Sequence, residues 1–247
     1  MLDDAVTKLQ ESFCLIDLQG EIRTLDKRQI KEVLEGNNEH DLNYYQNQPA
    51  NLLMERLLEA SNLALEDKEI RQAIKEFKRS PETLFYTSVA FDPRPQPPRV
   101  LNLWRGHTVT PKEGNCEVIE DLIYDIICDR SDEKYDYLLK YLAHTIQKPE
   151  EKPGVMPVFI GGQGVGKGSF CRLLEAIFSR TTLFAQNITE VLGKFTGSLE
   201  RNYIVWLDEA LFTHDKRSSD QLKSVLTEPT MRIEQKFQPK RTIQSHH

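Results

Sequence analysis

A glycine-rich loop in the second half of the chain constrains the fold more than any other sequence feature. Residues 161–169 read GGQGVGKGS and fit the frame G-x-x-x-x-G-K from Gly161 to Lys167. The apolar run at 155–160 predicts a buried strand before the loop, and residues 169–178 predict a helix after it. A strand, a loop of this kind and a helix in this order are typical of a site that cradles polyphosphate.

The chemistry of such a loop follows from its residue types. Glycines let the backbone curl so that successive N–H groups point inward, at the positive end of a helix dipole. Lys167 supplies a point charge for the β- and γ-phosphates. A hydroxyl for Mg²⁺ is expected directly after this lysine, but Gly168 stands there, so we assign that role to Ser169. The residues expected to bind the nucleotide are Gly161, Gly162, Gln163, Gly164, Val165, Gly166, Lys167, Gly168 and Ser169. The alternative is a glycine-rich turn that binds no ligand.

A second apolar run ends in two acids. Residues 203–207 read YIVWL and predict a buried strand, which Asp208 and Glu209 close. We expect Asp208 to hold Mg²⁺ together with Ser169, and Glu209 to polarise the attacking water as general base. With Lys167, the two acids form the candidate catalytic set. A solvated strand end would explain the acids alone, but their position downstream of the loop favours the catalytic interpretation.

Two buried strands with a helix between them indicate an α/β fold with a parallel sheet, of the P-loop NTPase class. Turn signals divide the chain into an N-terminal α+β region at 1–91, a linker and helical region at 92–153, and an ATPase core at 154–247. The N-terminal region is mainly helical, with a small hairpin turned at Gly20. The elements expected outside the core are the hairpin 12–25, helices 27–35, 50–65 and 67–78, the proline-rich linker 92–99, and helices 117–129 and 133–147.

Basic residues gather at the turn of a second predicted hairpin near the end of the chain. After a helix predicted over 218–226, residues 231–237 alternate as in a strand, and 242–244 can pair back. The turn carries Lys236, Lys240 and Arg241. Exposed cations at such a tip can contact the backbone of single-stranded DNA. The alternative is a solvated surface hairpin, and the net charge of −6 means that any DNA contact must be local.

The composition, with 39% hydrophobic and 28% charged residues, is that of a soluble globular protein. No apolar run approaches the roughly 20 residues that span a bilayer, and the acidic N-terminus has no signal core. We therefore expect a cytoplasmic location and no membrane partner. The four cysteines form no C-x-x-C pair, which favours buried reduced thiols over zinc or dithiol chemistry.

Further segments accompany the loop and the acids. They are Phe91-Asp92-Pro93, Asn102–Gly106 (NLWRG), Tyr141-Leu142-Ala143, Gln147-Lys148-Pro149, Leu207–Ala210, Leu222-Lys223 and Ile233–Lys236. From about Ser88 onward, this set resembles the C-terminal, helicase-like region of phage and plasmid primase-polymerases, which belongs with the superfamily 3 helicases. The loop and the acids occur in many ATPases, whereas the N-L-W-R-G and Q-K-P elements are more specific.

This resemblance implies an AAA+-like core that binds ATP with Mg²⁺, assembles into a ring that is often hexameric, and moves 3′ to 5′ on single-stranded DNA. The implied function is that of an ATP-dependent DNA helicase motor in a replication protein. In that family a sensor strand follows the basic hairpin and an arginine finger lies further on. Both would follow His247, so we expect a core that is incomplete at its C-terminus.

Two other functions are open at this point. A nucleotide-binding assembly or replication-loading module would bind ATP with little turnover. The spacing G-K-G-S also occurs in the adenylate-kinase family, so a small nucleotide kinase is a further alternative. The long segment before the loop and the acids after it favour the motor over the kinase.

Overall fold

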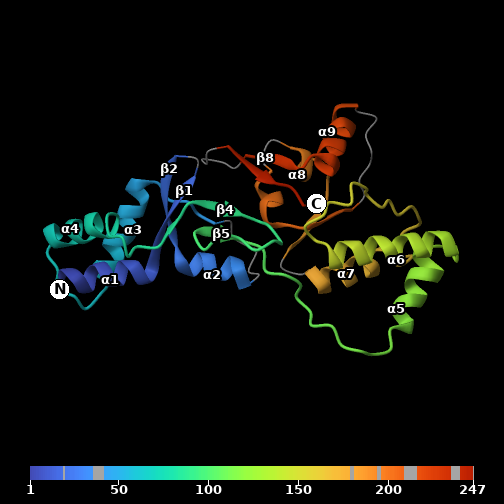
Figure 1. The fold of residues 1–247 in the computed structure, drawn as a ribbon, viewed down its shortest axis with the longest axis horizontal. Helices are drawn as coiled ribbons and strands as arrows, with labels where there is room; N and C mark the ends of the chain where they lie inside the picture. Colours follow the sequence, from blue (N-terminus) through green and yellow to red (C-terminus); the bar gives the residue numbers. More distant parts are fainter. Residues whose placement is uncertain are drawn as a thin grey trace. The chain divides into compact units, whose positions relative to one another are not determined.

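The computed structural model describes residues 1–18, 20–35, 42–178, 181–193, 196–208, 216–234 and 240–246. The chain, drawn as a ribbon in Figure 1, separates into two compact units. The N-terminal unit comprises Met1–Ala90 with Gln96–Leu103, and the loop-bearing unit comprises Phe91–Pro95 with Trp104–His247. The glycine-rich loop and Asp208 belong to the loop-bearing unit.

Helices and short strands alternate in the N-terminal unit. In chain order they are α1 (Leu2–Ser12), β1 (Phe13–Leu18), β2 (Glu21–Asp26), α2 (Lys27–Glu35), α3 (Asn47–Glu59), α4 (Asp67–Phe77), β3 (Phe85–Tyr86), β4 (Ser88–Ala90) and β5 (Val100–Asn102). The predicted helix 27–35 is confirmed by α2. The helix predicted over 67–78 is confirmed by α4, whose first turn carries a capping box formed by Glu66 and Glu69.

β1 and β2 form the predicted hairpin. They pair antiparallel along their whole length, starting with Phe13 opposite Asp26. Gly20 has a φ of +92°, a left-handed conformation that favours glycine, and its amide donates to Oδ1 of Asp17 at 2.6 Å. β3 then adds to the free side of β1 in parallel, and the three strands form one small sheet.

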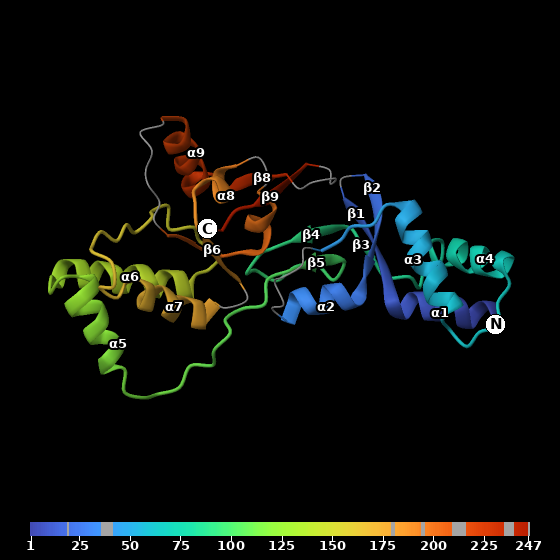
Figure 2. The same ribbon diagram turned by 180° about the vertical axis from the view of Figure 1, so that it is seen from behind.

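One apolar cluster holds the N-terminal unit together. α1, α3 and α4 lie side by side in both views (Figures 1 and 2) and fully bury Leu9, Met54, Leu58 and Phe77 between them. Full burial of a side chain of this size contributes about 1.5–3 kcal/mol. This cluster, which also includes Phe13 and Leu15 of β1, therefore stabilises the unit.

The bounds of α3 differ from the predicted 50–65. The helix begins earlier, at Asn47, because Pro49 falls in the first turn, where its missing N–H has no helical partner to lose. It ends at Glu59, and the apolar residues Leu63 and Leu65 pack against the cluster from beyond the helix end. Apolar residues two positions apart fit extended chain rather than a helix.

The loop-bearing unit combines helices with short paired strands. Its elements are α5 (Glu117–Asp121), the π-helix η1 (Leu122–Ile127), α6 (Asp132–Gln147), α7 (Lys167–Phe178), β6 (Thr182–Ala185), α8 (Thr189–Leu192), the 3₁₀-helix η3 (Gly197–Arg201), β7 (Ile204–Leu207), α9 (Lys216–Thr227), β8 (Thr230–Ile233) and β9 (Arg241–Gln244). The predicted helices 133–147, 169–178 and 218–226 correspond to α6, α7 and α9. The helix predicted over 117–129 is instead a short α-helix that continues as a π-helix.

The strand predicted at 155–160 is wrong. Across the described ranges no strand pairs with this segment, and Val155 and Ile160 are 42% and 95% exposed. β7 pairs in parallel with β6 instead, with Ile204 opposite Thr182. An apolar run predicts burial, but a strand also needs a neighbour that completes its hydrogen-bond ladder. The observed unit is a mixed α/β unit with small sheets, and its described residues contain no parallel sheet that includes the segment before the loop.

Trp104 of the N-L-W-R-G segment has a structural role. Its ring centroid lies 5.4 Å from that of Phe91 and 5.3 Å from that of Tyr203, the residue before β7. Phe178, at the end of α7, contacts Tyr203 at 5.3 Å, and the Tyr203 hydroxyl donates to the Thr145 carbonyl at 2.9 Å. The segment that the family resemblance singles out therefore fixes the start of β7.

The proline-rich linker 92–99 contains no helix or strand, as predicted. Its first residue, Asp92, is nevertheless buried. The carboxylate accepts hydrogen bonds from the backbone and the guanidinium of Arg94, at 2.9 and 2.6 Å, and lies 3.9 Å from Nε2 of the buried His246. The linker thus begins inside the loop-bearing unit.

Three of the four cysteines are buried, as predicted, whereas Cys116 is exposed. Burial raises the pKa of Cys14 and of Cys171 to about 12, so these thiols stay protonated at neutral pH. None of the helices that the structure describes has the length and apolar character that crossing a bilayer requires.

Candidate functional site

The glycine-rich loop leads directly into the N-terminus of α7. Gly164 and Gly166 have φ values of +78° and +105°, a region that L side chains rarely adopt. The carbonyl of Gly166 accepts from the amides of Ser169 and Phe170, at 3.0 and 3.1 Å, and so begins the helix. Since residues 161–165 are exposed, the loop presents its backbone to solvent at the positive end of the α7 dipole.

The Lys167 side chain closes over this loop. Its ammonium donates to the carbonyls of Gly161 and Gly162, at 2.9 and 2.8 Å. A phosphate oxygen is a stronger acceptor for an ammonium than a neutral carbonyl. The lysine is therefore held where an arriving polyphosphate could replace its carbonyl partners.

The apolar face of α7 anchors the loop to the rest of the unit. Phe170, Cys171 and Leu174 are buried, while Gly168 and Ser169 in the first turn remain exposed. Phe170 and Leu174 pack in one cluster with α6 and η1. The hydroxyl predicted to serve Mg²⁺ is thus on the solvent side of a firmly packed helix.

Asp208 directly follows β7, whose Trp206 packs in one cluster with Phe170 and Leu174 of α7. Its amide donates to the carbonyl of Ala185 at 3.0 Å, which continues the parallel pairing of β6 and β7 by one residue. Burial is the main cause of the raised pKa of Cys171 in α7, and the charges of Glu175 and Asp208 raise it further. The Asp208 carboxylate is exposed at the end of β7. The second predicted acid, Glu209, lies outside the described residues.

The donor set is compatible with Mg²⁺. Ser169 and Asp208 offer a hydroxyl and a carboxylate, both exposed, and hard oxygen donors are the ligands that Mg²⁺ takes. The described residues contain no group of three or more His, Cys, Asp or Glu side chains suited to a metal ion. A magnesium ion here would therefore depend on few side chains and on phosphate oxygens and water, which is its usual manner of binding at nucleotide sites.

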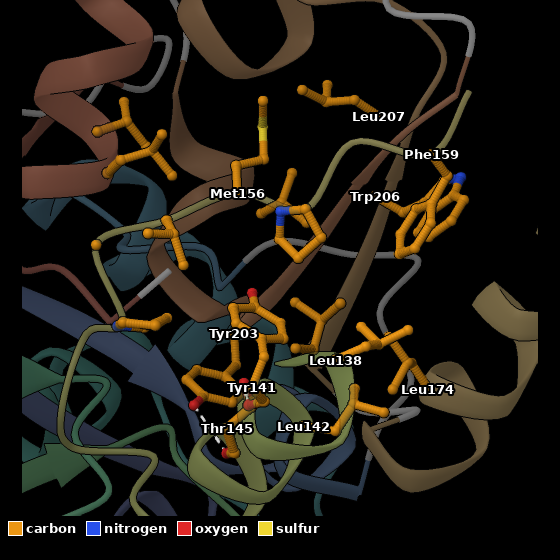
Figure 3. A pocket seen from close by; sticks show the side chains of 18 of the residues that line it. Leu138, Tyr141, Leu142, Thr145, Met156, Phe159, Leu174, Tyr203, Trp206 and Leu207 are labelled. Atoms are coloured by element: carbon orange, nitrogen blue, oxygen red, sulfur yellow. Dashed lines mark hydrogen bonds between the residues drawn. The ribbon is translucent and has the colours of Figure 1, made fainter. Parts of the chain in front are cut away.

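An apolar cavity lies beside the site, between the segment before the loop and β7 (Figure 3). Residues 153–157 and Phe159 line one side and residues 203–207 the other, with side chains of α6, α7 and α9 around them. Phe159 stacks on Trp206, with centroids 5.9 Å apart and an angle of 15°, and meets Phe170 edge-on at 5.3 Å. Aromatic contacts of Phe159, two residues before Gly161, thus anchor the chain that enters the loop.

The π-helix η1 contacts the loop at Gly166. The position that a Cβ would take at Gly166 is 3.2 Å from Cδ1 of Leu122 and 3.2 Å from Cγ2 of Ile126. The sequence interpretation missed these two residues. Their spacing of four predicts a shared helical face, but nothing local indicates what that face touches.

The basic hairpin is confirmed as β8 and β9, but the environments of its cations differ. Lys240 is half exposed and forms an ion pair with Glu234 at 2.7 Å. Arg241 is buried, with its guanidinium 2.7 Å from the buried Glu200 carboxylate. The prediction that Arg241 is an exposed tip residue is therefore corrected, because its side chain points into the unit. Lys236 lies outside the described residues.

A family model described as "Family of unknown function (DUF5906)" matches residues 159–247. The match includes the loop, α7, β7 and the basic hairpin, and it covers less than half of the chain. Comparison with curated proteins found no match.

Among solved structures, the chain is similar to apo structures of the NrS-1 C-terminal region. One, of residues 305–718, is 18% identical with a TM-score of 0.67, and another, the A form, is 17% identical with a TM-score of 0.68. The similarity covers 97% of this chain, but only 54% and 53% of those chains. The chain thus spans about half the length of these structures, and at this identity the likeness is one of fold.

Proposed function

We propose that this chain is a helicase-type ATPase that binds ATP with Mg²⁺ at residues 161–169 and moves on single-stranded DNA during phage or plasmid replication. The observation that carries the proposal is the loop itself. Left-handed Gly164 and Gly166 lead into the N-terminus of α7, and Lys167 donates to two loop carbonyls. The fold likeness to the NrS-1 C-terminal region is consistent with this assignment.

Each residue of the site has a defined task in this proposal. The loop amides and Lys167 hold the β- and γ-phosphates, and Ser169 and Asp208 hold Mg²⁺. The ion, when bound, neutralises charge that develops on the phosphate oxygens. Glu209 accepts a proton from the water that attacks the γ-phosphate. Hydrolysis then breaks the bond between the β,γ-bridging oxygen and the γ-phosphorus.

The test of this proposal is the substitution Lys167→Ala. Two charge-assisted hydrogen bonds from the ammonium to phosphate are worth about 1.5–3 kcal/mol each, so we expect a loss of affinity of at least about a hundredfold. Calorimetric titration of MgATP into both proteins measures it. Lys140→Ala, which removes an exposed lysine of α6 that pairs with Asp136, is the matched control and should bind as wild type does.

Unchanged MgATP affinity in Lys167→Ala would remove the nucleotide from this loop. If binding were lost as expected but the wild type hydrolysed no ATP with or without DNA, the alternative of a nucleotide-binding assembly or loading module would hold instead. Phosphoryl transfer to a nucleoside monophosphate would identify the kinase. Each outcome therefore selects one of the three functions.

DNA binding and ring assembly are parts of the same proposal. Lys236 and Lys240 are the cations that we assign to single-stranded DNA, since Arg241 is buried against Glu200. A homo-oligomeric ring of the often hexameric kind that the family resemblance implies would present one hairpin per subunit. Several weak contacts on one strand would then act together.

A further inference from the structure

The loop packs against an irregular helix that no sequence motif indicates. Gly166 approaches η1 so closely that a Cβ at this position would lie 3.2 Å from side-chain atoms of Leu122 and Ile126. These distances are tight for a Cβ, so a larger residue at this position would require the side chains of Leu122 and Ile126 to shift. Gly166 therefore combines a left-handed backbone, with a φ of +105°, with close packing against Leu122 and Ile126.

The geometry of η1 lets both side chains reach the glycine. The amide of Cys128 donates to the carbonyl of Ile123 at 2.8 Å, which is the five-residue spacing of a π-helix. Leu122 and Ile126 are four residues apart and share a face of this helix. Single π-turns occur often at functional sites, where they turn particular side chains toward a ligand or a loop.

An apolar cluster and a hydrogen bond connect η1 to the two helices beside it. Ile123 and Cys128 are buried in one cluster with Phe170 and Leu174 of α7, the helix that the loop begins. The Tyr124 hydroxyl donates to the Asp132 carboxylate of α6 at 2.9 Å. η1 is thus in contact with both neighbouring helices, α6 and α7.

We propose that Leu122 and Ile126 are positioning residues for the phosphate loop: they hold Gly166 in its left-handed conformation, which orients the amides at the start of α7. The inference depends on the proposed nucleotide site. The Gly166 carbonyl begins α7, so a shift of this glycine moves the amides of Lys167 and Gly168 away from the phosphates. Preformed geometry of this kind lowers the cost of binding.

Ile126 is the residue to test, because 49% of it is exposed and shortening it opens little of the core. We expect Ile126→Ala to weaken binding of MgATP and of magnesium tripolyphosphate by the same factor, on the order of tenfold. Turnover at saturating ATP should change little, since the catalytic acids are untouched. Ile126→Val, which keeps most of the contact, should restore most of the affinity. Thermal unfolding of each variant shows whether the fold is intact.

Val118→Ala is the matched control, since Val118 is an apolar residue of the same helical stretch and is 83% exposed. It should bind both ligands as wild type does. Equal affinities in wild type and Ile126→Ala would overturn the proposal. Weaker binding of ATP with unchanged binding of tripolyphosphate would also overturn it, because Ile126 would then contact the nucleobase.

If the proposed nucleotide-binding function itself were wrong, the wild-type protein would give a different result. Wild-type protein would then bind neither MgATP nor tripolyphosphate, and both proposals would fall together. If Ile126→Ala did not fold, Ile126→Met would decide instead, because methionine keeps the apolar bulk but lacks the Cγ2 methyl that contacts Gly166. A folded Ile126→Met protein with an equal loss for the two ligands supports positioning, and one with wild-type affinity for both contradicts it.

Discussion

Asp208 and Glu209 are adjacent in the sequence, yet their proposed tasks require both to reach one site. Successive side chains on a strand point to opposite faces, so two neighbouring acids can converge only where the strand has ended. β7 ends at Leu207, directly before Asp208. Asp208 is exposed, and Trp206, two residues before it, packs in one cluster with Phe170 and Leu174 of α7, the helix that follows the glycine-rich loop.

Neutralising each of the two acids is expected to change a different property, turnover for Glu209 and MgATP affinity for Asp208. Glu209→Gln should keep MgATP affinity and lose roughly 10²–10⁴-fold in turnover, the usual contribution of a general base. Asp208→Asn should weaken binding itself, and only when Mg²⁺ is present, because a metal ligand acts on the bound ground state. Calorimetry with and without Mg²⁺, together with steady-state hydrolysis, separates the two. Wild-type turnover in Glu209→Gln would place the base elsewhere.

At the scale of elements, sequence patterns within a short stretch of chain predicted the helices and hairpins formed by that same stretch. The β1–β2 hairpin followed from two β-prone runs around Gly20, and α2 followed from its helical spacing. The segment 155–160 could not be judged in this way, because an apolar run does not say whether a second strand lies beside it. The same limit applies to the candidate site. The loop is formed by consecutive residues and can be predicted from them. Its contact with Ile126 joins residues that are far apart in the sequence, so the sequence pattern does not predict it.

The β8–β9 hairpin shows how register changes a functional interpretation. Ile233 lies opposite Arg241, and both are buried, so Arg241 belongs to the inner face of the pair.

We expect Lys236→Gln with Lys240→Gln to flatten the log–log salt dependence of single-stranded DNA binding by up to about 1.4, at about 0.7 per phosphate contact. Fluorescent DNA titrations at several salt concentrations measure the slope.

Base sequence should not matter to this effect, because phosphate contacts carry no sequence information. Lys31→Gln with Lys140→Gln, which removes the same charge from the exposed faces of α2 and α6, is the matched control. An equal change in slope for both double variants would mean that total charge, and not the hairpin, sets DNA binding.

At the scale of the whole molecule, the buried residues Asp92 and His246 link stability to pH. Burial lowers the pKa of His246 below 6.5, the charge of Asp92 opposes this, and the charges of Arg94 and Lys152 add to it. Burial alone would raise the pKa of Asp92, but hydrogen bonds from Arg94 and the charge of His246 lower it on balance. The folded chain therefore prefers neutral histidine beside ionised aspartate.

This preference predicts the direction of acid sensitivity. The unfolded chain binds a proton at His246 more readily than the folded chain does, so the stabilising contribution is complete above pH 6.5 and is lost as the pH falls toward the lower folded-state pKa. Urea unfolding at pH 7.5, 6.5 and 5.5 should show a falling free energy of unfolding in the wild type. His246→Gln should reduce that fall. The same pH dependence in both proteins would exclude His246 as its source.

The stacking of Phe159 on Trp206 has an optical consequence (Figure 3). The chain has two tryptophans, and Trp206 is the one connected to the candidate site: its stacking partner Phe159 is two residues before Gly161, and Asp208 is two residues after Trp206. Trp104 belongs to another aromatic cluster, with Phe91 and Tyr203. MgATP should therefore shift or quench the emission of the wild type and of Trp104→Phe, and leave that of Trp206→Phe unchanged. The chain carries its own spectroscopic probe of nucleotide occupancy, without any attached label.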